Sequence, residues 1–150
     1  MPSEHLIVRQ IEFAETDMAG IMHFSNFFRL MESAETAFFR SLELPLFEEL
    51  DGKMIGWPRV RARCDFHHPL RFGDFVEVHL FVKEIRIHAL NFFFRFRKRL
   101  PDETRIAIAR GEMTTVCATL DEKTKELVSL PLPDIVRARI EEAPREAWRE

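Results

Sequence analysis

The segment Glu15–Leu42, ETDMAGIMHFSNFFRLMESAETAFFRSL, joins a short polar loop to the longest helical pattern in the chain. From residue 24 to residue 42, apolar residues cover most of a helix drawn at ~100° per residue. The remaining narrow arc is polar and consists of Arg29, Glu32, Ser33, Thr36, Arg40 and Glu43. So wide an apolar surface predicts a helix over residues 24–42 that other elements cover on most sides. Pro45 marks its end, because the residue before a proline disfavours helical backbone.

The segments around this helix change to a period of two, which is typical of strands. We expect strands at residues 5–13, 57–66, 76–83, 91–98 and 105–119. In the second of these, Val60, Ala62, Cys64 and Phe66 alternate with Arg59, Arg61, Arg63 and Asp65, which predicts one buried and one solvated face. A short helix over residues 135–142, capped by Asp134, and a frayed tail from Pro144 complete the prediction. One helix among antiparallel strands predicts an α+β fold in a single domain, residues 1–150.

Composition narrows the classes of function. The net charge of -3 gives no general attraction to nucleic acid or to an anionic membrane. The two cysteines, Cys64 and Cys117, are expected to be reduced thiols in a cytoplasmic protein, and the N-terminus shows no signal-peptide pattern. No apolar run approaches the ~20 residues of a membrane helix. Phenylalanine occurs 15 times and tyrosine not at all, which fits a Phe-rich core, an apolar acyl or aryl pocket within it, or both.

The loop before the long helix contains the residues of greatest chemical interest. Asp17 and Gly20 precede a helix N-terminus, where unpaired N–H groups and the positive end of the helix dipole stabilise negative charge. Such a site can hold a thioester oxyanion, while a nearby carboxylate acts as nucleophile or general base. An ordinary turn uses the same residue types, so the loop alone leaves both interpretations open.

The sequence resembles the 4-hydroxybenzoyl-CoA thioesterase family, whose members have the hotdog fold. The resemblance covers residues 8–132. It is based on Thr16-Asp17, Ala19-Gly20-Ile21, Asn26-Phe27, Glu32, Gly56-Trp57-Pro58 and the turn Pro69-Leu70-Arg71-Phe72-Gly73-Asp74.

This resemblance implies an antiparallel sheet wrapped around one central helix, in homodimers or homotetramers with active sites between subunits. It assigns the catalytic carboxylate to Asp17 and the oxyanion donor to the backbone N–H of Phe24. Glu32 matches a position at the acyl end of the pocket, although it is equally a solvated helix residue. Arg86 matches a position that contacts the CoA phosphates. The other substrate-binding positions are Gly20, Ile21, His23, Ser25, Asn26 and Trp57.

The sequence also departs from the family pattern. His23 and Phe24 stand where members often have tyrosine or tryptophan. His23 could contact the acyl group, hydrogen-bond Asp17 or cap the loop, and we expect a binding or orienting role. Ile87 and His88 replace further basic residues, so Arg97, Lys98 and Arg99 are alternative phosphate contacts, and acyl carrier protein remains an alternative to CoA. Glu35 interrupts the apolar arc of the helix. It is either a second pocket carboxylate with a raised pKa or an edge residue paired with an arginine.

The predicted function is hydrolysis of a small, medium-chain or aromatic acyl-CoA thioester without a metal or redox cofactor. Asp17 would either attack the carbonyl or activate water. Two alternatives are a specialised 4-hydroxybenzoyl-CoA or dihydroxynaphthoyl-CoA thioesterase and a non-catalytic acyl-CoA-binding hotdog domain. Ser25 lacks the GxSxG setting of a serine nucleophile. The pair His67-His68 lacks a third metal ligand at a suitable spacing.

Overall fold

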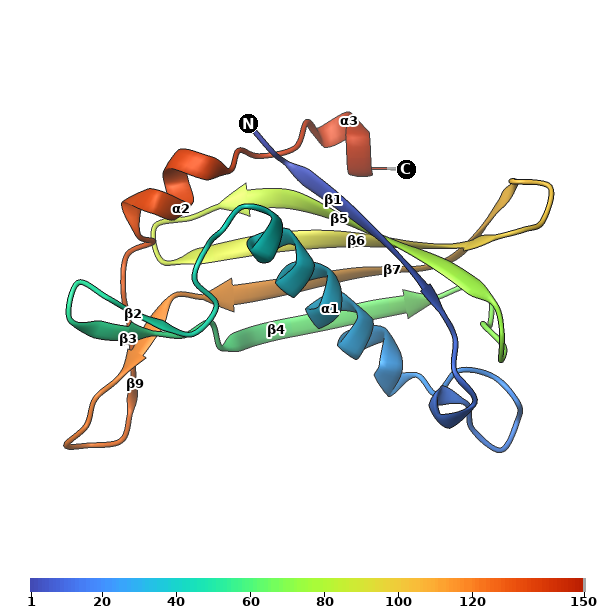
Figure 1. Ribbon diagram of the computed structural model, residues 1–150, viewed down its shortest axis with the longest axis horizontal. Helices are drawn as coiled ribbons and strands as arrows, with labels where there is room; N and C mark the ends of the chain where they lie inside the picture. The colour runs from blue at the N-terminus through green and yellow to red at the C-terminus, as the bar shows by residue number, and fades with distance from the viewer. Residues whose placement is uncertain (150) are drawn as a thin grey trace.

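A five-stranded antiparallel sheet curves around one long helix in the computed structural model, which describes residues 1–149 (Figure 1). The strand order is β1-β5-β6-β7-β4, and every neighbouring pair is antiparallel. The predicted α+β hotdog architecture is therefore confirmed. The elements are β1 (Glu4–Gln10), α1 (Ser25–Ser41), β4 (Arg59–Phe66), β5 (Phe75–Ile85), β6 (Ala89–Arg99) and β7 (Arg105–Val116).

Helix α1 packs on the concave side of the sheet through residues spaced three and four apart, as the period of a helix requires. The buried apolar side chains are Phe27, Leu30, Met31, Ala34, Phe38 and Phe39. The buried face is narrower than predicted, since Phe24 is 59% exposed and Phe28 and Ala37 are only half-buried. One side of α1 thus remains uncovered within a single chain.

Gly111 allows α1 to lie close to the middle of the sheet. A Cβ atom at this position of β7 would clash with Met31 of the helix and lie 3.1 Å from the carbonyl oxygen of Arg63. A side chain here would need the end of the Met31 side chain to move, so the absence of one leaves room for Met31 between the helix and the strand.

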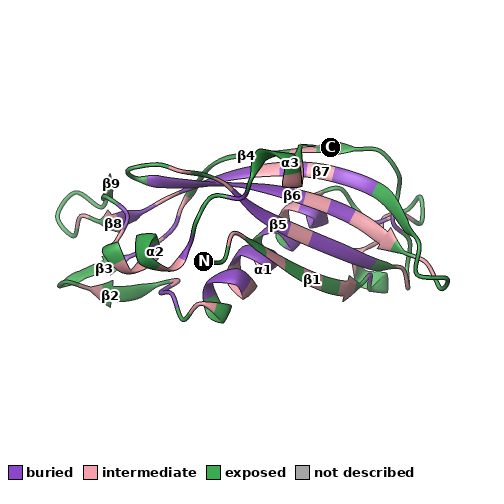
Figure 2. Ribbon diagram, turned by 90° about the horizontal axis from the view of Figure 1, so that it is seen from above, coloured by how far each residue is buried: buried purple, intermediate pink, exposed green. Residues whose placement is uncertain are grey.

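Strand β4 differs from its prediction. It forms an edge of the sheet, and both of its faces are largely exposed, with Val60 at 65% and Phe66 at 49% (Figure 2). The pairing of β4 with β7 shifts register between Arg59 and Arg61. This bulge turns Arg59 towards α1, whereas strict alternation had placed it on the solvated face with Arg61.

Shorter elements follow the main sheet at one end. The predicted strand over residues 105–119 is divided at Cys117 into β7 and β8 (Ala118–Leu120), which pairs with β9 (Leu127–Ser129). A second small hairpin consists of β2 (Glu48–Leu50) and β3 (Lys53–Ile55), which the sequence did not predict. Among residues 1–149, no helix has both the length and the apolar character needed to span a membrane.

The C-terminal segment crosses the convex side of the sheet. Helix α2 (Asp134–Arg139) has Pro133 as its N-cap, and Asp134 makes no side-chain capping bond, contrary to the prediction. The expectation of a frayed tail is also wrong, because α3 (Arg145–Trp148) is ordered. Trp148 packs on Phe93 with ring centroids 5.5 Å apart, and an aromatic contact of this kind holds the segment in place.

Candidate active site

The loop between β1 and α1 is closed by its own hydrogen bonds. It begins with the 3-10 helix η1 (Phe13–Glu15) and folds back so that Thr16 bridges to Met22. The carbonyl oxygen of Glu15 accepts hydrogen bonds from the backbone N–H of His23 and from the side-chain amide of Asn26, both at 2.9 Å. The loop is therefore fixed directly onto the first turn of α1.

Asp17 is half-buried within this loop and one of its two carboxylate oxygens is occupied. Oδ1 accepts the backbone N–H groups of Ala19 at 2.8 Å and Ile21 at 3.4 Å. Gly20 completes the turn with φ = +79°, a conformation that favours glycine. Within residues 1–149, the other oxygen, Oδ2, accepts no hydrogen bond. The loop thus orients the carboxylate and leaves one oxygen available for chemistry.

Phe24 provides an unpaired backbone donor at the beginning of α1. It has helical dihedral angles as the N-cap residue, and its N–H meets no acceptor within the described residues 1–149. Beside it, His23 Nδ1 lies 2.8 Å from Ser25 Oγ, and the ring centroids of His23 and Phe24 are 4.7 Å apart. A free N–H at the positive end of a 17-residue helix suits an anionic oxygen.

The remaining residues predicted in this loop have defined structural roles. Asn26 is buried, and its amide hydrogen-bonds to Glu15, so it fixes the loop. Ile21 bridges to Arg71 and supplies one of the N–H groups that orient Asp17. Asp17, Gly20, Ile21, His23, Phe24, Ser25 and Asn26 therefore lie together at one end of α1.

Glu32 and Trp57 belong to a second group, farther along α1. They line a cavity of about 270 Å³ with Glu35, Thr36, Leu46, Phe47, Gly56 and Arg59. Glu35 lies eleven positions after Phe24, which corresponds to about 16 Å of helix. The two groups are therefore not joined within one chain.

Glu35 is the functional candidate in this second group. Its side chain is 1% exposed, accepts a hydrogen bond from the Thr115 hydroxyl at 3.0 Å and contacts Arg59 at 3.3 Å. Burial raises the pKa of Glu35 to about 7, against the opposing influence of Arg59 and Thr115, and the Glu32 charge raises it further. Glu35 thus lines a cavity and is paired with an arginine, as the two interpretations from the sequence expected, but it is buried and does not lie at the edge of the helix face.

Arg86 lies far from Asp17 in the same chain. Gln10, just before the Asp17 loop, pairs with Phe75 at the beginning of β5, whereas Arg86 follows the end of β5. An 11-residue strand spans about 35 Å. Arg86 pairs with Glu84 at 3.0 Å on an exposed turn. A single chain therefore does not bring Arg86 to the Asp17 loop.

The alternative basic residues lie nearer the Asp17 end of β5 but are already paired. Arg99, with Arg105, holds the buried Glu77 by hydrogen bonds of 2.8 Å. Burial alone would raise the pKa of Glu77, but Arg99 and Arg105 lower it. Arg97 also lies 3.8 Å from Glu77. Lys98 pairs with Asp74 at 3.2 Å. These residues stabilise the sheet in the described chain.

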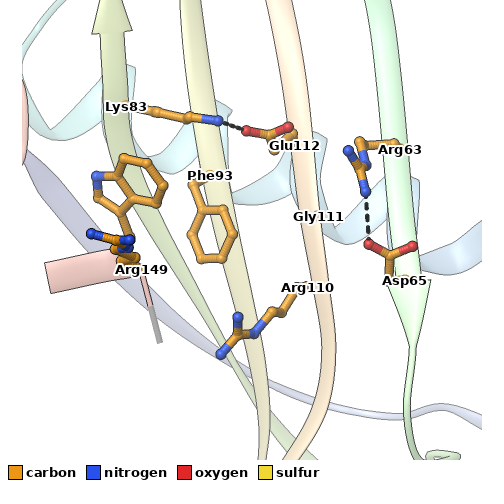
Figure 3. Close-up of a pocket in the computed structure, with 9 residues that line it drawn as sticks. Arg63, Asp65, Lys83, Phe93, Arg110, Gly111, Glu112 and Arg149 are labelled. Atoms are coloured by element: carbon orange, nitrogen blue, oxygen red, sulfur yellow. Dashed lines mark hydrogen bonds and ion pairs between the residues drawn. The ribbon is translucent and has the colours of Figure 1, made fainter. Parts of the chain in front are cut away.

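A separate cleft of about 250 Å³ lies on the convex side of the sheet, away from α1 (Figure 3). Phe93 and Trp148 form its apolar wall. Charged pairs surround it, namely Arg63 with Asp65 and Lys83 with Glu112. None of the residues predicted for the active site lines this cleft. Within residues 1–149, no three His, Cys, Asp or Glu side chains are grouped so that they could hold a metal ion.

The fold agrees with the comparison to known families. A family model described as the thioesterase-like superfamily matches residues 11–140, and the chain belongs to this superfamily.

Individual relatives give more detail. A 1,4-dihydroxy-2-naphthoyl-CoA hydrolase from Synechocystis is 28% identical over 125 residues, which are 83% of this chain and 86% of the relative. The structure of a gentisyl-coenzyme A thioesterase aligns with a TM-score of 0.75 at 30% identity, covering 89% of this chain and 99% of the other. The 4-hydroxybenzoyl-CoA thioesterase of Pseudomonas sp. strain CBS-3 aligns with a TM-score of 0.80 at 21% identity over 91% and 99% of the two chains, and shares the fold.

Proposed function

We propose that this chain hydrolyses acyl-CoA thioesters with Asp17 as the catalytic carboxylate and the Phe24 N–H as the oxyanion donor. The observation that carries the proposal is the pairing, in one hydrogen-bonded loop, of a free carboxylate oxygen with a free N–H at a helix N-terminus. Relatives that act on CoA thioesters support the reaction type.

The proposed reaction consumes one water molecule and needs no metal or redox cofactor. The Phe24 N–H and the helix dipole bind the thioester carbonyl oxygen and stabilise the negative charge that develops on it. In one route, Asp17 takes a proton from water as the hydroxide adds to the carbonyl carbon. In the other route, Asp17 itself attacks and forms an anhydride that water then cleaves. In both routes the C–S bond breaks and the CoA thiolate leaves and is protonated.

The proposed substrates carry an aromatic acyl group. The named relatives act on 1,4-dihydroxy-2-naphthoyl-CoA and gentisyl-coenzyme A, and a cavity walled by Trp57 and Phe47 suits a ring. Small and medium-chain acyl-CoA, and acyl carrier protein in place of CoA, are the alternatives for assay. A binding domain without turnover is the remaining alternative, which the free Asp17 oxygen disfavours. The proposed location is the cytoplasm, consistent with the free thiols of Cys64 and Cys117.

The proposed assembly is a dimer or a tetramer built from dimers, in which two β4 edges pair antiparallel. Pairing about Arg63 sets Arg61 opposite Asp65 of the partner subunit and Ala62 opposite Cys64 of the partner subunit. Opposite charges and small apolar side chains then face each other on both sides of the two-fold axis. On the axis itself, Arg63 faces Arg63 of the partner subunit, and each of these arginines is paired with Asp65 of its own chain. The exposed β4 edge supports this arrangement, since an unpaired edge strand readily accepts another strand.

Such a dimer would complete the site. Helix α1 runs antiparallel to β4, because Phe27 contacts Phe66 at 5.0 Å while Glu35 contacts Arg59. Antiparallel pairing of two β4 strands therefore brings the α1 N-terminus of one subunit towards the Glu35 cavity of the other. A thioester held at Phe24 would direct its acyl group into the cavity of the partner subunit.

The test is release of free thiol from a panel of acyl-CoA esters by wild type and by Asp17→Asn. We expect the substitution to lower kcat/KM by at least ~100-fold, as for loss of a positioned acid–base group. Asp51→Asn, on an exposed turn, is the matched control. Equal rates for wild type and Asp17→Asn would overturn the mechanism, and thioester binding without turnover would favour the binding-domain alternative.

A further inference from the structure

Glu35 is a buried carboxyl group that the reaction at Asp17 does not use. It projects from α1 into the cavity lined by Trp57 and Phe47. One oxygen, Oε2, accepts the Thr115 hydroxyl, while Oε1 lies 3.3 Å from Arg59. Burying a carboxyl group to 1% exposure costs free energy unless hydrogen bonds compensate for the lost water. The two partners of Glu35 leave some of its acceptor sites unused, so a ligand could bond to them.

The size and lining of the cavity define what it can hold. Its volume of about 270 Å³ exceeds the ~150 Å³ that accommodates benzene in an engineered protein cavity. The indole N–H of Trp57 donates to the Pro45 carbonyl at 3.0 Å, so Trp57 presents only an apolar surface. The polar side chains that line the cavity are Glu35, Arg59, Thr36 and Glu32, and both glutamates lie within 4.0 Å of Arg59.

We infer that Glu35 is a specificity-determining residue that selects acyl groups carrying a hydroxyl at the end remote from the thioester. A hydroxyl donates to Oε1 of Glu35 and accepts from Arg59, which satisfies both groups. A carboxylate on the acyl group is excluded, because Glu32 and Glu35 together outnumber Arg59 in charge. The inference rests on the proposed function and on the dimer, which brings the thioester within reach of the cavity.

The selection should depend on pH. Besides Arg59 of β4, the charged group facing Glu35 is Glu32 of α1, which lies 4.0 Å from Arg59, and β7 contributes the neutral Thr115. Ionised Glu35 forms a stronger, charge-assisted hydrogen bond to a hydroxyl, and an unsubstituted ring leaves the charge without this partner. Because burial raises the pKa of Glu35 to about 7, preference for the hydroxyl should increase as pH rises through 7.

The test compares kcat/KM for 4-hydroxybenzoyl-CoA and benzoyl-CoA between pH 6 and pH 8. We expect wild type to prefer the hydroxylated ester by about tenfold, the effect of one hydrogen bond to a charged group. Glu35→Met should reduce this preference to within about twofold. Glu35→Gln retains hydrogen bonding and should retain a preference that no longer varies with pH. Ionisation of Asp17 changes kcat/KM for both esters equally, so its effect cancels in the ratio of the two kcat/KM values.

Glu126→Gln, on an exposed turn, serves as the matched control, and thermal unfolding confirms that each variant is folded. A preference that is unchanged in Glu35→Met overturns the inference while leaving the thioesterase proposal intact. A wild-type preference that does not vary with pH, or that falls as pH rises, overturns it as well. Absence of any hydrolysis by wild type overturns the proposed function and this inference together.

Discussion

Arg59 Nη2 lies 3.3 Å from Glu35 Oε1, and the contact exists because β4 bulges between Arg59 and Arg61. Without the bulge, Arg59 would point to the convex side with Arg61, and Glu35 would face the sheet with only Thr115 as a partner. A bulge at a sheet edge thus redirects one side chain into the cavity and partly compensates a buried carboxylate.

The free energy of unfolding should depend on pH through Glu35. Its pKa is about 7 in the folded protein against an ordinary value of 4.5. The folded state binds this proton more tightly, so the stability that it confers is complete below pH 4.5 and is lost as pH rises to about 7. The difference between these two pKa values corresponds to about 3 kcal/mol in the free energy of unfolding. Glu35→Gln lacks this dependence.

Urea denaturation of wild type and Glu35→Gln from pH 5 to pH 8 measures the effect. The other titrating groups are common to both proteins, so their effects cancel in the difference between the two free energies of unfolding. This difference should shift in favour of Glu35→Gln as pH rises. Parallel pH courses would show that Glu35 has an ordinary pKa.

The sequence identified the fold because its main signals are periodic. The helical arc of residues 24–42 and the alternating segments around it predicted α1 and the five strands of the sheet. Two of the errors in the predicted fold have causes that the sequence pattern does not show. The bulge at β4 adds one residue that no alternation pattern reveals, and the order of the C-terminal segment comes from the tertiary contact of Trp148 with Phe93.

The candidate site was only partly predictable. Local chemistry marked the loop as a candidate, since a carboxylate, a glycine turn and a helix N-terminus adjoin in sequence, and the family resemblance supplied the roles of Asp17 and Phe24. The separation of Asp17 from Arg86 did not follow, because it depends on how β1 pairs with β5 and on the length of β5. In the second group, the resemblance pointed to Glu32 and Trp57, and the helical pattern pointed to Glu35 as a charged residue inside an apolar arc.

Reversing one charge on β4 should weaken the proposed dimer. In the pairing about Arg63, Asp65→Arg places an arginine opposite Arg61 of the partner subunit, and the two-fold axis repeats the contact. Like charges directly opposite each other are destabilising. Two such contacts should weaken association by about tenfold. Sedimentation equilibrium of Asp65→Arg, and of the double variant Arg61→Asp/Asp65→Arg that restores complementarity, measures it. Equal weakening in both variants would reject this register.

The α3 segment should contribute to stability but not to the chemistry. Trp148 covers Phe93, which is 8% exposed, and Lys83 Nζ lies over the Trp148 ring, 5.0 Å from its centroid. Trp148→Ala should lower the free energy of unfolding by about 2 kcal/mol, less than for a fully buried aromatic residue. Thioester hydrolysis at 25 °C should remain within about twofold. Urea denaturation and the thiol-release assay check both, with exposed Arg145→Ala as the control. A large loss of activity in folded Trp148→Ala would connect the convex face to the site.

Gly111→Ala should destabilise the protein through the contact between β7 and α1. The new methyl group meets Met31 and the Arg63 carbonyl oxygen at 3.1 Å, and overpacking of this kind costs about 1–3 kcal/mol. The end of the Met31 side chain is flexible and can move aside, whereas the Arg63 backbone cannot. In a Met31→Leu background the cost should therefore be smaller, but not zero. Urea denaturation of the four proteins in this cycle gives the coupling energy. Gly56→Ala, whose added atom would lie 3.5 Å from Phe47, is the control for a glycine in ordinary contact. Strictly additive costs would mean that Met31 does not set the approach of the helix to the sheet.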